Sequence, residues 1–192
     1  ITFKYNRDYV FEDASATINK GDFAAITGIS GIGKSTLLKL LLGVMSPEKG
    51  TIRVVTDDFE RTVDRNTRKL FSYVPQGNTM FSGTIAENMR NVKQDATDEE
   101  IIRAAKEAHS WEFIERLPKG LDTVLHEDSI SQGQKQLLCI TRVMLCLPPM
   151  LILDEATSSI DTRTEQQIQQ AMDQLMENRT SFVIAHRLST IK

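Results

Sequence analysis

One short stretch constrains the fold of this chain more than any other feature. Residues 28–35 read Gly-Ile-Ser-Gly-Ile-Gly-Lys-Ser, which fits the pattern G-x-x-x-x-G-K-[ST]. The apolar residues Phe23 to Thr27 precede it and predict a strand, and the leucine-rich segment from Lys34 to about Gly43 predicts a helix. The sequence therefore predicts a strand, a glycine-rich turn and a helix, which together form a binding site for phosphate groups.

The residue types in this stretch each have a physical use beside a phosphate. Glycines allow successive backbone N–H groups to turn towards phosphate oxygens, and the start of the following helix attracts the same anion. Lys34 brings a positive charge to the β- and γ-phosphates, and the Ser35 hydroxyl can bind Mg²⁺. The residues expected to bind a nucleotide here are Gly28, Ser30, Gly31, Ile32, Gly33, Lys34, Ser35 and Thr36. The motif alone leaves kinases, GTPases, motors and transporters open.

Two adjacent carboxylates follow a second apolar segment. Leu151 to Leu153 predict a buried strand, and Asp154 and Glu155 come directly after it. Asp154 can reach Mg²⁺, and Glu155 can polarise a water molecule in line with the γ-phosphate. An acidic turn after a buried strand is common by itself, but its combination with the phosphate loop favours the catalytic interpretation.

Hydrophobic periodicity divides the rest of the chain into alternating strands and helices. Thr84 with Glu87, Thr97 with Glu100 and Thr162 with Glu165 each predict the start of a helix. The expected strands are 1–5, 14–18, 23–27, 51–55, 70–74, 150–153 and 180–185, the first two forming a small antiparallel part. This alternation predicts an α/β fold of the P-loop NTPase type, with a mostly parallel sheet core and an inserted α-helical subdomain. We expect one domain over 1–192, in which 1–76 and 147–192 form the core and 77–146 the helical subdomain.

Composition narrows the class of protein. The net charge of −3 gives no electrostatic reason to expect nucleic acid or an anionic membrane as a partner. No apolar run approaches the length needed to cross a bilayer, and the first residues do not resemble a signal peptide. Cys139 and Cys146 lie in an apolar segment, so we expect two reduced core cysteines. Because the chain lacks an initiator methionine, we expect a piece of a longer polypeptide that is truncated at its C-terminus.

A polar tetrapeptide completes the set of motifs. Ser131, Gln132, Gly133 and Gln134 stand at the predicted start of a helix that runs to Cys146, and by themselves they would be a polar helix cap. With the phosphate loop and the acidic pair, however, the chain resembles the ATPase domains of ABC transporters over essentially its whole length. Four further segments match that family in order: Tyr5 in Phe-Lys-Tyr, Gln76 in Val-Pro-Gln, Ser158 to Asp161, and His186 in Ala-His-Arg-Leu-Ser.

The resemblance implies a role for each of these residues. Tyr5 would stack on adenine, with Tyr9 as a rival for that role. Ser131, Gln132, Gly133 and Gln134 would contact the nucleotide bound by a second domain, and Asp161 would lie in the loop that crosses to it. Gln76 would contact Mg²⁺ and the attacking water and face a membrane domain, and His186 would contact the γ-phosphate. The implied catalytic residues are Glu155, His186 and Gln76, and the implied metal-binding residues are Ser35, Gln76 and Asp154.

The chain differs from the usual family pattern near the signature, and two other segments indicate the exporter subclass. Ile130 and Gln132 replace the usual leucine and first glycine of the signature, and the segment between Glu127 and Ser131 is about three residues shorter than the usual exporter pattern. The segments from Met80 to Ile85 and from Phe113 to Val124 are similar to those of exporters. The resemblance thus implies ATP hydrolysis at the cytoplasmic face of the cell membrane, which drives export through a transmembrane domain on the same polypeptide. It leaves open a homodimer or a heterodimer and the identity of the substrate.

Three other classes compete with a transport ATPase. ABC ATPases that act on nucleic acid carry a coiled coil or zinc modules before the signature, but Gly77 to Ile130 contains no heptads and no cysteines. A translation-factor ABC protein would carry basic linkers, which the net charge disfavours. A nucleotide kinase would share the phosphate loop without the other motifs.

Overall fold

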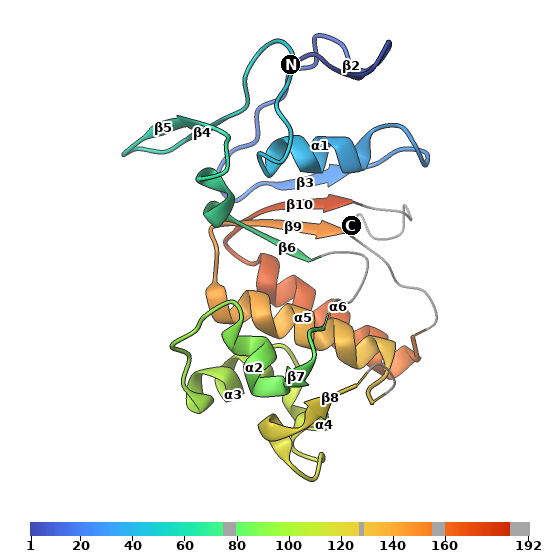
Figure 1. Ribbon diagram of the computed structural model, residues 1–192, viewed down its shortest axis with the longest axis vertical. Helices are drawn as coiled ribbons and strands as arrows, with labels where there is room; N and C mark the ends of the chain where they lie inside the picture. The colour runs from blue at the N-terminus through green and yellow to red at the C-terminus, as the bar shows by residue number, and fades with distance from the viewer. Residues whose placement is uncertain (75–79, 127–128, 155–159, 185–192) are drawn as a thin grey trace. The chain divides into compact units, whose positions relative to one another are not determined.

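The computed structural model describes residues 1–74, 80–126, 129–154 and 160–184 (Figure 1). The sequence-predicted residues Gln76, Glu155, Ser158 and His186 lie outside this part of the chain. The chain divides into two compact units, which are considered separately. The first comprises Ile1–Ser72, Pro148–Leu153 and Thr180–Lys192, and the second Tyr73–Leu147 and Asp154–Arg179.

A four-stranded sheet forms the centre of the fold. Its order is β3 (Phe23–Ile26), β10 (Thr180–Ile184), β9 (Met150–Asp154) and β6 (Phe71–Val74). β10 pairs with β3 in parallel, so that Ser181 lies opposite Phe23 and Ile184 opposite Ile26. The predicted α/β fold with a parallel sheet is therefore confirmed.

Apolar packing explains why these segments form the sheet. Leu151, Ile152 and Leu153 are all fully buried, as a strand covered on both faces requires. The helix α1 (Lys34–Leu41) places Leu38 against Ile152 and Phe182 of the sheet. Because α1 follows β3 directly after the glycine-rich loop, this packing fixes the start of α1 at the end of the sheet where parallel α/β folds bind ligands (Figure 1).

Two antiparallel hairpins belong to the first unit, and one of them differs from the prediction. β1 (Phe3–Tyr5) pairs with β2 (Asp8–Phe11), and β4 (Arg53–Val55) pairs with β5 (Glu60–Thr62). The prediction of a strand over residues 14–18 was wrong. A tight turn at Asn6, which has φ of 55°, lets the nearer segment pair with β1 instead, since asparagine tolerates the left-handed region. The 14–18 segment is then left mostly exposed.

The second unit is mainly helical. Its helices are α2 (Ile85–Arg90), α3 (Asp98–Glu107), α4 (Trp111–Ile114), α5 (Gln132–Cys146) and α6 (Thr162–Met176). Short elements complete the description: β7 (Gly83–Thr84) pairs with β8 (Val124–Leu125), and the 3₁₀ turns are η1 (Thr67–Leu70), in the first unit, and η2 (Gly120–Asp122). Ile85, Met89, Ile101, Ala105, Ile114 and Leu138 form the fully buried centre of this unit.

Three predicted N-caps can be compared with the helix starts of the second unit. The boxes at Thr84 with Glu87 and Thr97 with Glu100 are confirmed, with both reciprocal hydrogen bonds formed. The predicted cap at Thr162 was wrong by one residue. Asp161 caps α6 instead, because its carboxylate accepts a hydrogen bond from the backbone N–H of Thr164 at 2.9 Å.

Two further observations concern the cysteines and the helices. Cys139 is buried and Cys146 is exposed, and neither forms a disulfide, so the prediction that both lie in the core was wrong for Cys146. α5 ends at Cys146, and the next residue, Leu147, has a left-handed backbone conformation.

Within the described residues, no helix combines the length and the apolar character that crossing a membrane would require.

Candidate nucleotide-binding site

The glycine-rich loop ends in a residue that only glycine suits. Gly33 has φ of 110°, a left-handed conformation that is strained for other residues. A Cβ atom at this position would also collide with the side chain of Val10 on β2. The loop can therefore pack against Val10 of β2, and α1 begins at the next residue.

The start of α1 is open to an anion. Gly33 occupies the N-cap position and supplies no side-chain hydrogen bond, whereas α2, α3, α5 and α6 are each capped by a side-chain oxygen. The first N–H groups of an α-helix lack intrahelical partners and carry the positive end of the helix dipole. This helix start can therefore donate to phosphate oxygens.

Lys34 is held inside the loop. Its side chain is 9% exposed, and its ammonium group donates hydrogen bonds to the carbonyl oxygens of Gly28 at 2.5 Å and Ile29 at 3.0 Å. These bonds place the positive charge beside the open start of α1. The next residue, Ser35, is exposed in the first turn, while Thr36 is buried.

A pocket of about 560 Å³ adjoins the loop in the first unit. It is lined by Tyr5, Asn6, Asp8, Tyr9, Val10, Gly31 and Ile32. The hydroxyl of Tyr5 lies 3.3 Å from Met45 Sδ and 3.5 Å from Thr36 Oγ1, so the ring is fixed beside the phosphate loop. Both tyrosines predicted as candidates for stacking thus line one pocket, which has an aromatic wall and the phosphate loop at its edge.

Asp154 ends β9, as the sequence predicts, and has a partner that sequence reasoning missed. The hydroxyl of Tyr73 on β6 donates a hydrogen bond to Asp154 Oδ2 at 3.2 Å. Partial burial and the adjacent Asp154 carboxylate raise the pKa of Tyr73 to about 12, so the phenol stays protonated and acts as a donor. A signal was available: Tyr73 lies near the end of the predicted 70–74 strand, and the ends of parallel strands meet at one edge of a sheet.

In the second unit, the signature residues form the start of α5. Ser131 is the N-cap, and its hydroxyl accepts a hydrogen bond from the backbone N–H of Gln134 at 3.2 Å. The side chain of Gln134 in turn accepts from the backbone N–H of Ser131 at 2.9 Å. Gln132 is exposed and Gly133 is buried. This capping box gives Ser131 and Gln134 fixed orientations.

Gly133 also sets the distance between two helices. A Cβ atom there would lie 3.0 Å from Ile160 Cγ2 and closer still to Thr164 Cγ2. The start of α5 therefore approaches the start of α6 as closely as the absence of a side chain allows. The packing brings the signature close to Ile160 and Thr164, on either side of the Asp161 cap, within the second unit.

We expect Gly133→Ala to lower the free energy of unfolding by ~1 kcal/mol or more, because an added methyl group in a packed contact causes strain. The sign is informative, since alanine at an unobstructed helical position would instead stabilise the protein. Urea unfolding followed by the fluorescence of Trp111, the only tryptophan of the chain, measures the change. Adding Thr164→Ser removes the obstructing methyl group and should recover part of the loss. A stabilised Gly133→Ala variant would contradict the close approach.

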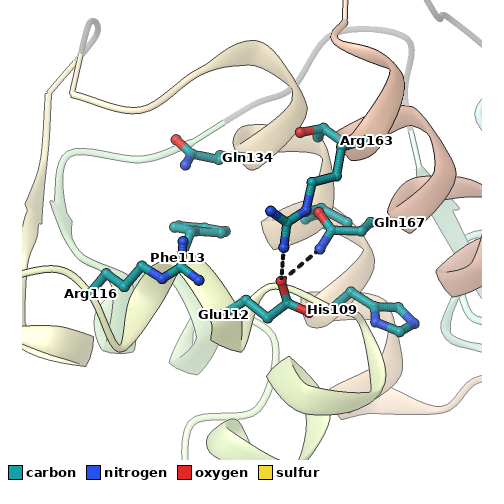
Figure 2. Close-up of a pocket in the computed structure, with 9 residues that line it drawn as sticks. His109, Glu112, Phe113, Arg116, Gln134, Arg163 and Gln167 are labelled. Carbon is teal, nitrogen blue, oxygen red and sulfur yellow. Dashed lines mark hydrogen bonds and ion pairs between the residues drawn. The ribbon is translucent and has the colours of Figure 1, made fainter.

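A second pocket, of about 170 Å³, lies in the second unit beside Gln134 (Figure 2). Arg163 and Gln167 of α6 both donate to Glu112 Oε2, at 3.2 Å and 3.0 Å, and Figure 2 shows the two side chains converging on it. Asp161 lies just before this helix, and the hydrogen bond from Thr164 N–H lowers the pKa of its carboxyl. The side chains around this pocket thus hold the starts of α4 and α6 to one another.

The phosphate loop and the pocket lined by Tyr5 both lie in the first unit. In the second unit, Tyr73 contacts Asp154, and Gly133 at the start of α5 packs against Ile160 and Thr164. A parallel sheet, an uncapped helix start after a glycine-rich loop, and a buried lysine bonded to the carbonyls of that loop are the features of a P-loop NTPase domain.

The comparison with known families specifies this class. Residues 11–158 match the family described as "ABC transporter", which is more than half of the chain. The chain therefore belongs to the ABC transporter family, and it is an ATP-binding domain of that family.

Several curated proteins are similar over the whole chain. It is 45% identical over 195 residues to the uncharacterized ABC transporter ATP-binding protein YfiC of Bacillus subtilis, covering 100% of this chain and 32% of that protein. It is 44% identical to the putative multidrug export ATP-binding/permease protein YgaD of the same species, covering 100% of this chain and 34% of YgaD. It is 42% identical to the ATP-dependent lipid A-core flippase of Desulfotalea psychrophila, again covering 100% and 34%. The chain thus spans about a third of the length of these relatives.

Proposed function

We propose that this chain hydrolyses ATP to drive export of a substrate through an attached transmembrane domain. The observation that carries this proposal is the similarity of the entire chain to one third of proteins named as a multidrug exporter and a lipid flippase. The remaining two thirds of such a protein have room for a membrane domain on the same polypeptide. The ATPase domain would then lie at the cytoplasmic face of the cell membrane. The transported substrate would be selected by residues outside this chain.

The residues present fit ATP and Mg²⁺. The Tyr5 pocket offers aromatic surface for the base, and the start of α1 with Lys34 offers donors and charge for the phosphates. Ser35, Asp154 and Gln76 would each supply an oxygen ligand of the kind that Mg²⁺ prefers. When bound, Mg²⁺ would neutralise charge that develops on the phosphate oxygens.

Hydrolysis requires a base and a sensor of the γ-phosphate. Glu155 follows Asp154 directly and would take the proton of the attacking water. Gln76 would orient the same water, and His186 would contact the γ-phosphate through its imidazole ring. These three assignments rest on the motifs in which the residues stand.

The signature would serve the nucleotide of a second domain. A serine hydroxyl has one donor and two acceptor positions. Ser131 uses its oxygen as an acceptor within the capping box, so its O–H can donate to a phosphate oxygen brought to the start of α5. Gln132, Gly133 and Gln134 would present the neighbouring groups of the same helix start, and Asp161 would lie close to the dimer contact. The closed state is thus a dimer of nucleotide-binding domains, formed with an identical or a different partner.

A test of this arrangement divides two lesions between two chains. We expect Lys34→Ala and Ser131→Arg each to inactivate the full-length protein as a uniform assembly. In a doubly tagged heterodimer with one lesion in each chain, both lesions fall in one site and the other site is intact. Phosphate release should return to as much as about half of the wild-type rate, provided that one site suffices.

The matched control carries both substitutions in one chain, paired with a wild-type chain. Its two sites then each contain one lesion, so it should remain inactive although its composition is the same. If both arrangements keep the same substantial activity, each chain hydrolyses ATP alone. If differently tagged copies do not purify together, the second domain comes from a different polypeptide, and the lesions are divided between this chain and that partner.

A further inference from the structure

The hydrogen bond between Tyr73 and Asp154 has no place in the assignments above. Tyr73 lies on β6 and Asp154 ends β9, and these strands are neighbours in the sheet. The Tyr73 side chain is 40% exposed while the next residue, Val74, is buried, as expected when successive side chains point to opposite faces of a strand. The Tyr73 hydroxyl therefore reaches across the strand ladder to the carboxylate that ends the neighbouring strand, 3.2 Å away.

We propose that Tyr73 is a positioning residue for the metal site, whose hydroxyl holds the Asp154 carboxylate in the orientation that binds Mg²⁺. This inference rests on the proposed role of Asp154. The final torsion of an aspartate side chain is broad, so a hydrogen bond to one carboxylate oxygen narrows the range of orientations. A donor fixed on a neighbouring strand removes that freedom at Oδ2 and leaves the charge of the carboxylate in place. Partners of metal ligands act in this way in many metal sites.

Geometry explains why tyrosine suits this position. The ring spans the distance between adjacent strands, and the phenol presents a donor that remains protonated at neutral pH. Phenylalanine would keep the ring and its packing but remove the donor. A bond that merely stabilises the strand ends would contribute to stability and leave metal binding unchanged, so the two roles can be separated by experiment.

The test uses Tyr73→Phe in the full-length protein, with Mn²⁺ as the probe and a non-hydrolysable ATP analogue bound. Electron paramagnetic resonance of free Mn²⁺ gives the dissociation constant of the metal. We expect that constant to rise about 10-fold, the lower end for losing a partner of a metal ligand. The affinity for the analogue in EDTA should be unchanged, because the lesion acts only through the metal. The Mg²⁺ concentration that gives half-maximal ATPase activity should rise in parallel, and kcat should recover at high Mg²⁺.

The matched control is Ser72→Ala, which removes a hydroxyl from the adjacent, partly buried residue of the same strand. We expect it to bind Mn²⁺ as the wild type does. Circular dichroism checks folding, and the affinity reports only folded sites, because the metal is held there together with the nucleotide. A Tyr73→Phe variant with wild-type Mn²⁺ affinity would overturn the positioning role, whatever its stability.

A third variant separates this inference from the proposed function. Asp154→Ala should weaken Mn²⁺ binding strongly, and adding Tyr73→Phe to it should have no further effect if Tyr73 acts through Asp154. An additive loss in the double variant would mean that Tyr73 acts by another route. Unchanged Mn²⁺ binding in Asp154→Ala itself would instead refute the role of Asp154, and with it the basis of the inference.

Discussion

Lys34→Ala should weaken ATP binding at least ~30-fold, about 2 kcal/mol, the lower end for removing one member of a buried charge pair. The ammonium group lies inside the phosphate loop, against the carbonyls of Gly28 and Ile29, beside the uncapped start of α1. Its removal leaves the β- and γ-phosphates without their nearest positive charge. Titration with a fluorescent ATP analogue in the presence of Mg²⁺ measures the loss.

Lys39→Ala provides the control for charge and helix propensity. Lys39 lies in the same helix, is exposed, and is a lysine outside the loop. This variant should bind ATP with wild-type affinity. If Lys34→Ala also binds normally, the assignment of the phosphate loop is wrong.

Glu155→Gln should reduce ATP turnover by at least ~10²-fold while ATP binding is retained. Glutamine keeps the shape of the side chain and one acceptor oxygen but cannot take a proton from the attacking water. With ATP and Mg²⁺ present, this variant should accumulate as a closed dimer. Steady-state phosphate release measures the first effect, and size-exclusion chromatography with light scattering measures the second.

Glu165→Gln is the matched control, because Glu165 is an exposed glutamate in the first turn of α6. Its rate should equal that of the wild type. Wild-type turnover in Glu155→Gln would assign the base to another residue. A loss of turnover with an equal loss of ATP binding would place Glu155 in nucleotide binding rather than in proton transfer.

Local signals were enough to predict much of the fold. The boxes at Thr84 and Thr97 were predictable because each helix start depends on residues only three positions apart. The apolar run before Asp154 likewise identified a buried strand without knowledge of its neighbours. The strand, glycine-rich turn and helix around residues 23–41 were predictable for the same reason, since the motif is local in the sequence.

Predictions failed where two nearby segments compete for one partner. The 14–18 segment has suitable alternation, but the turn at Asn6 brings Asp8–Phe11 to β1 first. At α6 the aspartate at 161 stands one residue before the expected threonine and takes the N-cap position. Periodicity identifies candidates for an element, but the competition is decided by turn geometry and by the stronger acceptor.

The parts of the site that sequence reasoning missed depend on contacts between distant segments. Gly133 could be recognised as part of a motif, but its contact with Thr164 of α6 requires the packed helices. Tyr73 gave no motif of its own, because its importance comes from a hydrogen bond to a residue 81 positions later. Both are consequences of tertiary packing.

The pairing of β3 with β10 has a consequence for biosynthesis. Phe23–Ile26 leaves the ribosome long before its partner Thr180–Ile184, because the two strands lie far apart in the sequence. Until β10 is made, the backbone groups at this edge of β3 have no hydrogen-bonding partner strand. Unpaired strand edges promote aggregation. Contacts so distant in sequence also slow folding, because a long loop must close before they form. Nascent chains that stop before residue 180 are therefore expected to need chaperones, and completion of β10 should be the event that releases them.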